Sequence, residues 1–154
     1  MKKFIKIFLL ILVLALVIIQ FIKPDTNNPA EDKTKFIASN MQIPDNIFKQ
    51  LEKSCFDCHS YRTEWPWYSK ISPVVYLINS DVKKGREQLN FSVWGDYDKP
   101  RMMDKLDGTL TAVKDGEMPL SIYLPMHPEA KLSESDKKML TDWARTAKEQ
   151  LSTK

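Results

Sequence analysis

Cys55-Phe56-Asp57-Cys58-His59 is the stretch of this 154-residue chain that decides what the rest folds around. Two thiols three residues apart on a helical turn can each form a thioether with one vinyl group of the same porphyrin. The histidine that follows can then ligate the iron. Cys-x-x-Cys-His is accordingly typical of covalent attachment of a c-type haem. The stretch predicts one haem c, attached through Cys55 and Cys58, with His59 as the proximal iron ligand.

Two other chemistries use similar cysteine pairs. A thioredoxin-like redox dithiol needs a preceding strand in a βαβ frame, and no such frame is visible in the sequence. A zinc site needs four ligands, and the motif together with His127, the second of only two histidines, would supply that number. Haem is the preferred interpretation, and the dithiol and the zinc site stay open as alternatives.

Helical periodicity dominates on both sides of the motif. Apolar residues recur at helical spacing after Pro44, after Pro73, after Pro100 as far as Gly116 and Pro119, and after Ser133. Ser133 and Asp136 have the spacing of a capping box, which marks the start of the last helix. No run of alternating β-branched residues is present, so no sheet is expected. The predicted fold class is all-α, with long, aromatic-rich loops.

The N-terminus has the pattern of an export signal. Lysines cluster in the first six residues, and an apolar stretch follows as far as Ile22. Its length is close to the roughly 20 residues that a membrane-spanning helix needs. No small-residue cleavage site precedes Pro24. We therefore expect residues 1–23 to stay attached as a single transmembrane helix in the inner membrane, with everything after it facing the periplasm.

The segment after this helix differs from it in composition. Residues 24–43 are polar and contain prolines, which is typical of a tether. The predicted organisation is therefore a membrane anchor over residues 1–23, a linker over 24–43 and a c-type haem-binding domain over 44–154.

The charge of the chain excludes one class of partner. Its formal net charge is +3, but four lysines lie in the first 24 residues, which contain no acid, and 19 basic and 20 acidic residues remain beyond them. No basic stripe survives, so nucleic-acid binding is not expected. Two cysteines are also too few for a disulfide framework.

Further runs of sequence make the chain similar to a known family. These runs are residues 55–60 (CFDCHS), 65–69 (WPWYS), 71–74 (ISPV), 85–92 (GREQLNFS), 94, 116–119 (GEMP), 127–128 and 132–133. Together they resemble the bacterial haem-binding domain family, which consists of short, N-terminally anchored proteins related to cytochrome c. The resemblance covers roughly residues 45–145 and implies a small cytochrome c-like helical domain around a covalent haem. It also implies a periplasmic, membrane-tethered location, but it supplies no substrate.

The sixth iron ligand is expected to be Met118. Residues 116–119 resemble the methionine–proline ligand loop of small cytochromes c, in which thioether ligation raises the reduction potential. Pro119 biases Met118 toward an extended conformation, which frees its side chain from the preceding helix. Met126, His127 and a vacant position remain as alternatives.

Other residues are candidates for the surroundings of the haem. A ligating histidine normally donates its second ring nitrogen to a carbonyl, and the Ser72-Pro73 segment is the candidate for His59. Arg86 is a candidate partner for a haem propionate, because its planar fork suits a carboxylate; a solvated helix face is the competing interpretation. The candidates for walls of the porphyrin pocket are Trp65, Trp67, Tyr68, Phe91 and Trp94.

The preferred function is that of a membrane-tethered, monohaem, c-type cytochrome-like protein for periplasmic electron transfer or redox sensing, with a periplasmic redox partner. On this interpretation the protein is not an enzyme. One alternative is a haem-dependent, peroxidase-like enzyme, which needs an acid–base residue at an open iron, and His127 is the only spare histidine. A thiol-disulfide oxidoreductase is a further alternative if no haem is attached. A structural role next to a membrane complex is also compatible with the sequence.

Overall fold

The computed structural model describes residues 2–153, and all of the regular structure in that range is helical. The elements are α1 (Lys2–Ile18), η1 (Ile19–Phe21), α2 (Ile37–Asn40), α3 (Asp45–Ser54), α4 (Phe56–His59), η2 (Trp67–Lys70), α5 (Val74–Gln88), η3 (Phe91–Asp96), α6 (Lys99–Lys114), η4 (Pro128–Ala130) and α7 (Glu134–Thr153). The predicted all-α fold class is therefore confirmed.

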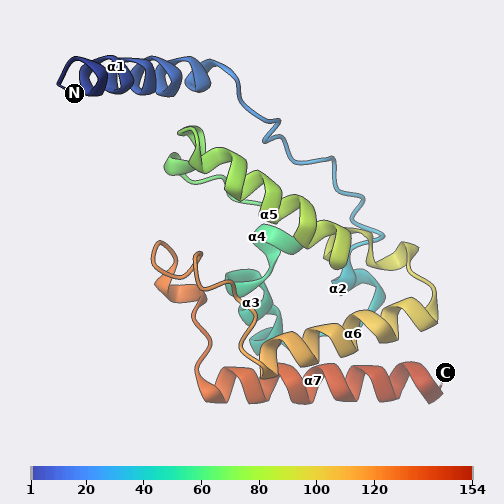
Figure 1. Cartoon of the computed structure of the whole chain (residues 1–154). Helices are drawn as coiled ribbons and strands as arrows, with labels where there is room; N and C mark the ends of the chain where they lie inside the picture. Colours follow the sequence, from blue (N-terminus) through green and yellow to red (C-terminus); the bar gives the residue numbers. More distant parts are fainter. Residues whose placement is uncertain (1, 154) are drawn as a thin grey trace.

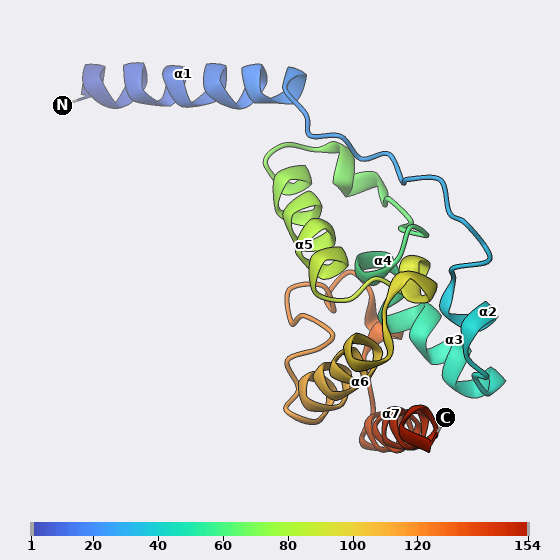
Figure 2. The ribbon, with the colours of Figure 1, turned by 90° about the vertical axis from the view of Figure 1, so that its right-hand side faces the viewer.

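The helices form one domain from which α1 projects alone (Figure 1). Helices α6 and α7 lie side by side and antiparallel along one edge of the domain, and α5 packs across the short helix α4. The second view shows the same arrangement from the side, with the loop between α6 and α7 next to α5 (Figure 2). Helix α4 thus lies near the middle of the domain, where elements from both halves of the chain meet.

The long helices begin where their capping residues predict. Asp98 accepts a hydrogen bond from the amide of Arg101 (3.0 Å), and Pro100 occupies the first turn of α6. At the start of α7, the amide of Ser133 donates to the Asp136 carboxylate (2.9 Å) and the amide of Asp136 donates to the Ser133 hydroxyl (3.2 Å). The predicted capping box is thereby confirmed.

The core is centred on an aromatic cluster that includes a residue of the motif. Phe56 is 2% exposed, and its ring centroid lies 5.6 Å from that of Phe36, 5.5 Å from that of Phe48 and 5.3 Å from that of Phe91. The first two pairs are edge-on and the third is tilted, and aromatic pairs contribute about 0.5–1.5 kcal/mol each beyond their buried area. The apolar residue between the two cysteines therefore fixes the motif to the core.

The segment expected to be a linker is packed on the domain around Phe36 and Ile37. Phe36 and Ile37 are 3% and 0% exposed and belong to the core. The Arg62 guanidinium lies 3.6 Å from the ring centroid of Phe36 and pairs with Glu31 at 2.8 Å. The sequence did not indicate this packing, because the segment is mostly polar and the partners of its two buried residues lie far along the chain. The folded unit therefore begins before Pro44.

Helix α1 and η1 together form an apolar rod that the domain does not bury. The span Lys2–Phe21 has a mean hydropathy of 2.9 and is 0% buried. Its 20 residues at 1.5 Å each correspond to about 30 Å, the thickness of a bilayer's hydrocarbon core. By length and composition this helix is a membrane anchor or a signal sequence.

Candidate functional site

One helical turn positions the three residues of the motif. Helix α3 ends at Ser54 and Cys55 caps it, and the amide of His59 donates to the Cys55 carbonyl (2.9 Å), which closes the turn of α4. Because Phe56 points into the core, the cysteines and the histidine lie on the other sides of this turn. Cys55 and Cys58 are free thiols, each partly buried.

A close approach between α4 and α5 holds this turn in place. A Cβ atom added at Gly85 would lie 2.6 Å from the carbonyl oxygen of Cys58 and 3.2 Å from its Cβ. Real Cβ atoms do not approach backbone oxygens this closely, so only glycine allows α5 to lie against the motif at this point.

Gly85→Ala is expected to destabilise the haem-free domain by about 1–3 kcal/mol, because α5 must move away from Cys58. Chemical denaturation measures this change. The matched control is Gly108→Ala in α6, where an added Cβ meets no atom within 4 Å and the gain in helix propensity is up to about 1 kcal/mol. Equal effects of the two substitutions would contradict the proposed contact.

His59 is oriented by a carbonyl other than the expected one. Its Nδ1 lies 3.0 Å from the Leu89 carbonyl oxygen, and since a carbonyl only accepts, Nδ1 is the donor. The expectation for the Ser72-Pro73 segment is wrong, because the Leu89 carbonyl is the acceptor instead. The Ser72 carbonyl accepts from the side chain of Gln20 (2.9 Å). Burial lowers the pKa of His59 and so favours the neutral ring, in which, with Nδ1 as the donor, the Nε2 lone pair is the one available to a metal.

Two adjoining cavities meet at His59. One, of about 360 Å³, is lined by Cys55 and α6; the other, of about 210 Å³, is lined by Cys58 and α5. His59, Gln88 and Met118 line both. We call this pair of cavities the cleft. It runs between α4–α5 on one side and α6 with its following loop on the other.

Met118 reaches the cleft because of the way α6 ends. Gly116 has φ = 73°, and the amide of Glu117 donates to the Ala112 carbonyl (2.9 Å), which together form a Schellman-type stop. The amide of Met118 donates to the same carbonyl (3.1 Å), so the chain turns back beside the last turn of α6. The half-buried Met118 side chain therefore lines both cavities that contain His59.

The two alternative sixth ligands lie elsewhere. Met126 is 53% exposed and lines a neighbouring cavity, which Cys58 lines too but His59 does not. His127 Nε2 lies 2.5 Å from the Tyr68 hydroxyl, and its ring stacks on Tyr123 with centroids 4.0 Å apart. His127 does not line the cleft.

The aromatic candidates are divided among several places. Phe91 lines the cleft, whereas Trp94 is buried in the core behind it, with ring centroids 6.4 Å apart. Tyr68 lines a neighbouring cavity that contains Cys58. Trp67 is 69% exposed, and Trp65 lines a surface cavity that contains neither cysteine. Of the predicted walls, only Phe91 therefore lines the cleft.

Arg86 is also used differently from either expectation. Its Nε donates to the Ser60 carbonyl (2.8 Å), and its guanidinium donates to Thr63 (2.9 Å) and to Asn28 (2.8 Å). These bonds join the segment after the motif to α5 and to the N-terminal segment. Arg86 thus holds the loop that follows His59 and does not line the cleft.

Several cleft residues were absent from the sequence prediction. Lys105 is the cation of the Cys55 cavity, with a side chain only 16% exposed, and its Nζ lies 3.9 Å from the carboxylate of Asp104, which lines the same cavity. Gly108 lies in the middle of α6, where glycine costs about 1 kcal/mol relative to alanine. A glycine inside a predicted helix, three residues after a lysine, was the feature of the sequence that could have indicated this face of α6.

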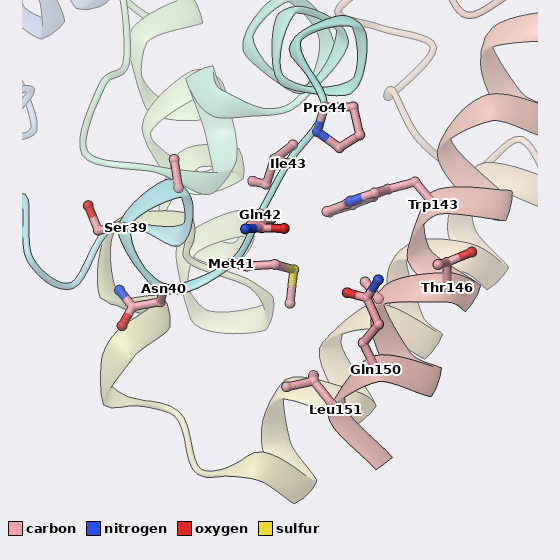
Figure 3. A pocket seen from close by; sticks show the side chains of 12 residues that line it. Ser39, Asn40, Met41, Gln42, Ile43, Pro44, Trp143, Thr146, Gln150 and Leu151 are labelled. Carbon is pink, nitrogen blue, oxygen red and sulfur yellow. The ribbon is translucent and has the colours of Figure 1, made fainter. Parts of the chain in front are cut away.

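A larger cavity lies away from this cleft. It has a volume of about 900 Å³ and lies between residues 38–44 and the second half of α7. Figure 3 shows Met41 and Trp143 pointing into it from opposite sides. Its lining contains no histidine, cysteine or charged side chain, so it offers none of the chemistry that the motif predicts.

Comparison with known proteins gives one match. A sequence model described as a haem-binding domain matches residues 14–146. No curated protein and no solved structure matches the chain.

Proposed function

Because the chain belongs to the haem-binding domain family, whose model spans residues 14–146, we propose that it carries one haem c, bound covalently through Cys55 and Cys58. His59 would ligate the iron from one side and Met118 from the other. The observation that carries this proposal is that one cleft is lined by all four of these side chains.

The cleft suits a flat macrocycle. An added Cβ at Gly108 would meet nothing within 4 Å, so α6 presents bare backbone to open space at this point. Gly108 and Cys55 line the same cavity, and the cation Lys105 lies one turn before Gly108. A helix face without a side chain, on the same cavity as the Cys55 thiol and the His59 imidazole, suits a planar group, and Lys105 suits an anionic edge on it.

Gly108→Leu is expected to fill this space and to lower the fraction of chains that carry haem by about tenfold, the equivalent of roughly 1.4 kcal/mol. Haem absorbance per mole of purified protein measures this fraction. The matched control is Thr111→Leu, because Thr111 is exposed on α6 and does not line the cleft. Equal haem loading of the two variants would contradict this packing.

We infer electron transfer as the activity of this site. The haem, when bound, supplies one-electron chemistry at its iron. With His59 and Met118 as its two protein ligands, the iron would offer a substrate no free position. The ferrous protein is expected to pass electrons to ferricyanide rapidly and to leave carbon monoxide unbound. Rapid carbon monoxide binding would contradict the closed site.

The peroxidase-like alternative lacks its acid–base residue at the cleft. His127 Nδ1 lies 3.2 Å from Glu129 and its Nε2 lies beside Tyr68, and His127 lines the neighbouring cavity and not the cleft. Within residues 2–153 no group of three or more histidine, cysteine or acidic side chains is placed to hold a metal ion by itself. The zinc alternative therefore has no support from the geometry.

The state of the thiols opposes the dithiol alternative. Burial, with the neighbouring Cys58, raises the pKa of Cys55 to about 12. Burial, with Asp57 and Asp81, raises the pKa of Cys58 to about 11. Redox-active cysteine pairs instead have lowered pKa values, because the thiolate is the nucleophile.

In the haem-free protein, alkylation of these thiols by iodoacetamide is therefore expected to be slow at pH 7, where only about 1 thiol in 10,000 is ionised at a pKa of about 11. The rate should rise as the pH increases and level off only near the raised pKa values. Rates followed by mass spectrometry between neutral and alkaline pH test this. A plateau below pH 8 would support a redox dithiol.

We further propose that α1 stays attached and tethers the domain to the periplasmic face of the inner membrane. The segment after α1 is bound to the domain: the Gln20 side chain donates to the Ser72 carbonyl (2.9 Å) and accepts from its amide (3.0 Å). Cleavage of α1 as a signal sequence, together with Gln20, would remove these contacts. Retention of the protein in the membrane pellet after alkaline carbonate extraction tests the tether, and its release would contradict it.

A further inference from the structure

The exposed apolar side chains of the domain are gathered in one place. Beyond residue 22, the large hydrophobic residues that are exposed in the described chain are Trp67, Ile71, Val74, Leu77, Ile122 and Met126. We call these six residues the apolar face. Three of them, Trp67, Leu77 and Ile122, are 69%, 57% and 68% exposed. Contiguous exposed apolar patches on a soluble domain mark an interaction surface.

The apolar face is continuous although it comes from two distant parts of the chain. Val74, Leu77, Ile122 and Met126 line the same cavity of about 180 Å³. Trp67 and Ile71 precede α5 directly, and the Trp67 ring packs edge-on against Tyr68, which lines that cavity too. The start of α5 and the loop between α6 and α7 therefore present one surface.

The apolar face adjoins the end of the membrane helix. Besides the Gln20–Ser72 pair, the Tyr76 hydroxyl donates to the Ile22 carbonyl, and the side-chain amide of Asn79 donates to the Asp25 carbonyl (2.6 Å). In both views, the start of α5 and the loop after α6 lie on the side of the domain toward which α1 projects (Figures 1 and 2). A bilayer that holds α1 would thus lie next to this face.

We propose that the apolar face rests on the lipid surface of the bilayer that holds α1. This proposal depends on the proposed retention of α1 as an anchor. The length of α1 and η1 together is about the thickness of the hydrocarbon core. Residues 20–22 would therefore lie at the membrane–water interface. Tryptophan is enriched at the membrane–water interface of membrane proteins, so the exposed Trp67 suits a position there. The face would hold the domain in one orientation and prevent it from turning freely on its tether.

This orientation also determines which side of the cleft lies toward the bilayer. The cavity beneath the apolar face is lined by Cys58 and Asp57 of the motif. The Cys58 side of the proposed haem site therefore lies toward the bilayer, and the Cys55 side with Lys105 lies away from it.

Photo-crosslinking tests which molecule covers the face. The full-length chain, with benzoylphenylalanine in place of Ile122, is reconstituted in vesicles of phosphatidylethanolamine and phosphatidylglycerol, irradiated, floated on a density gradient and analysed by mass spectrometry. The matched control carries the probe in place of Glu149, which is exposed on α7. A phospholipid adduct at position 122, and none at 149, is the expected result.

Each other outcome overturns the proposal in a distinct way. A chain that floats with the vesicles but forms no lipid adduct at position 122 is anchored without resting on the surface. A crosslinked dimer shows that a second copy covers the face. A chain that does not float has lost the anchor itself, which overturns the tether as well.

Polar replacement supplies a second measurement. Trp67→Ser combined with Leu77→Ser, with the probe kept at position 122, is expected to reduce the lipid adduct about tenfold, because both apolar contacts are lost. Trp67→Phe combined with Leu77→Ile should preserve it. Both residues are exposed, so the domain tolerates these changes. An adduct that the serine variant leaves unchanged would contradict the role of the face.

Discussion

Replacing both thiols, Cys55→Ser together with Cys58→Ser, is expected to remove all covalently bound haem from the chain. Serine hydroxyls do not form thioethers with the porphyrin vinyl groups, so any haem left in the cleft is held by His59 and packing alone. Haem staining of a denaturing gel after acid–acetone extraction measures the difference. The unchanged protein should keep its stain, and the double variant should lose it completely.

The single replacements are the controls for this experiment. Cys55→Ser and Cys58→Ser each leave one thioether, so each should keep some haem through the extraction, with an absorption maximum between those of the unchanged protein and of extractable haem. Stain that survives in the double variant would place the covalent attachment at another residue. Stain that is absent from the unchanged protein would exclude covalent attachment.

Replacing the proposed sixth ligand, Met118→Ala, is expected to open the distal side of the iron. The weak far-red band of sulfur-to-iron charge transfer should disappear from the oxidised spectrum, and carbon monoxide should bind the reduced protein. The reduction potential should fall by roughly 0.1–0.3 V, a part of the roughly 0.8 V range that axial ligands span. Thioether ligation favours the reduced iron, so its loss lowers the potential.

Two variants show whether the effect belongs to Met118. Met126→Ala and His127→Ala should both keep the far-red band, because neither side chain lines the cleft. A band that persists in Met118→Ala and disappears in Met126→Ala would assign the ligand to the other methionine. If the unchanged protein has no such band and His127→Ala opens the iron, ligation through His127 replaces the proposed pair.

Local signals predicted the parts of this fold that depend on local interactions. Pro100 and Gly116 bracket α6 because one fits the first turn of a helix and the other adopts a positive φ at its end. Ser133 and Asp136 start α7 through their reciprocal bonds. The Cys-x-x-Cys-His spacing indicated a haem attachment site because its cysteines and histidine lie within one helical turn.

Features that depend on contacts between distant segments were not readable in the same way. The partner of His59 is the Leu89 carbonyl, 30 residues along the chain, and nothing in the local sequence marks it. The sequence suggested two roles for Arg86, a propionate partner or a solvated residue. Its actual role, hydrogen bonding to Ser60 and Thr63, depends on where the loop after the motif lies. Phe36 belongs to the core although its neighbours are polar, because Phe56 is brought beside it.

The measurement that tests the central proposal most directly is the pyridine haemochrome spectrum of the purified, unmodified protein after acid–acetone extraction. A haem whose two vinyl groups have become thioethers to Cys55 and Cys58 stays with the protein pellet. Its reduced α band should lie at a shorter wavelength than that of free haem, with one haem per chain. A pellet without haem, or haem in the extract with the spectrum of intact vinyl groups, would contradict covalent attachment at this motif.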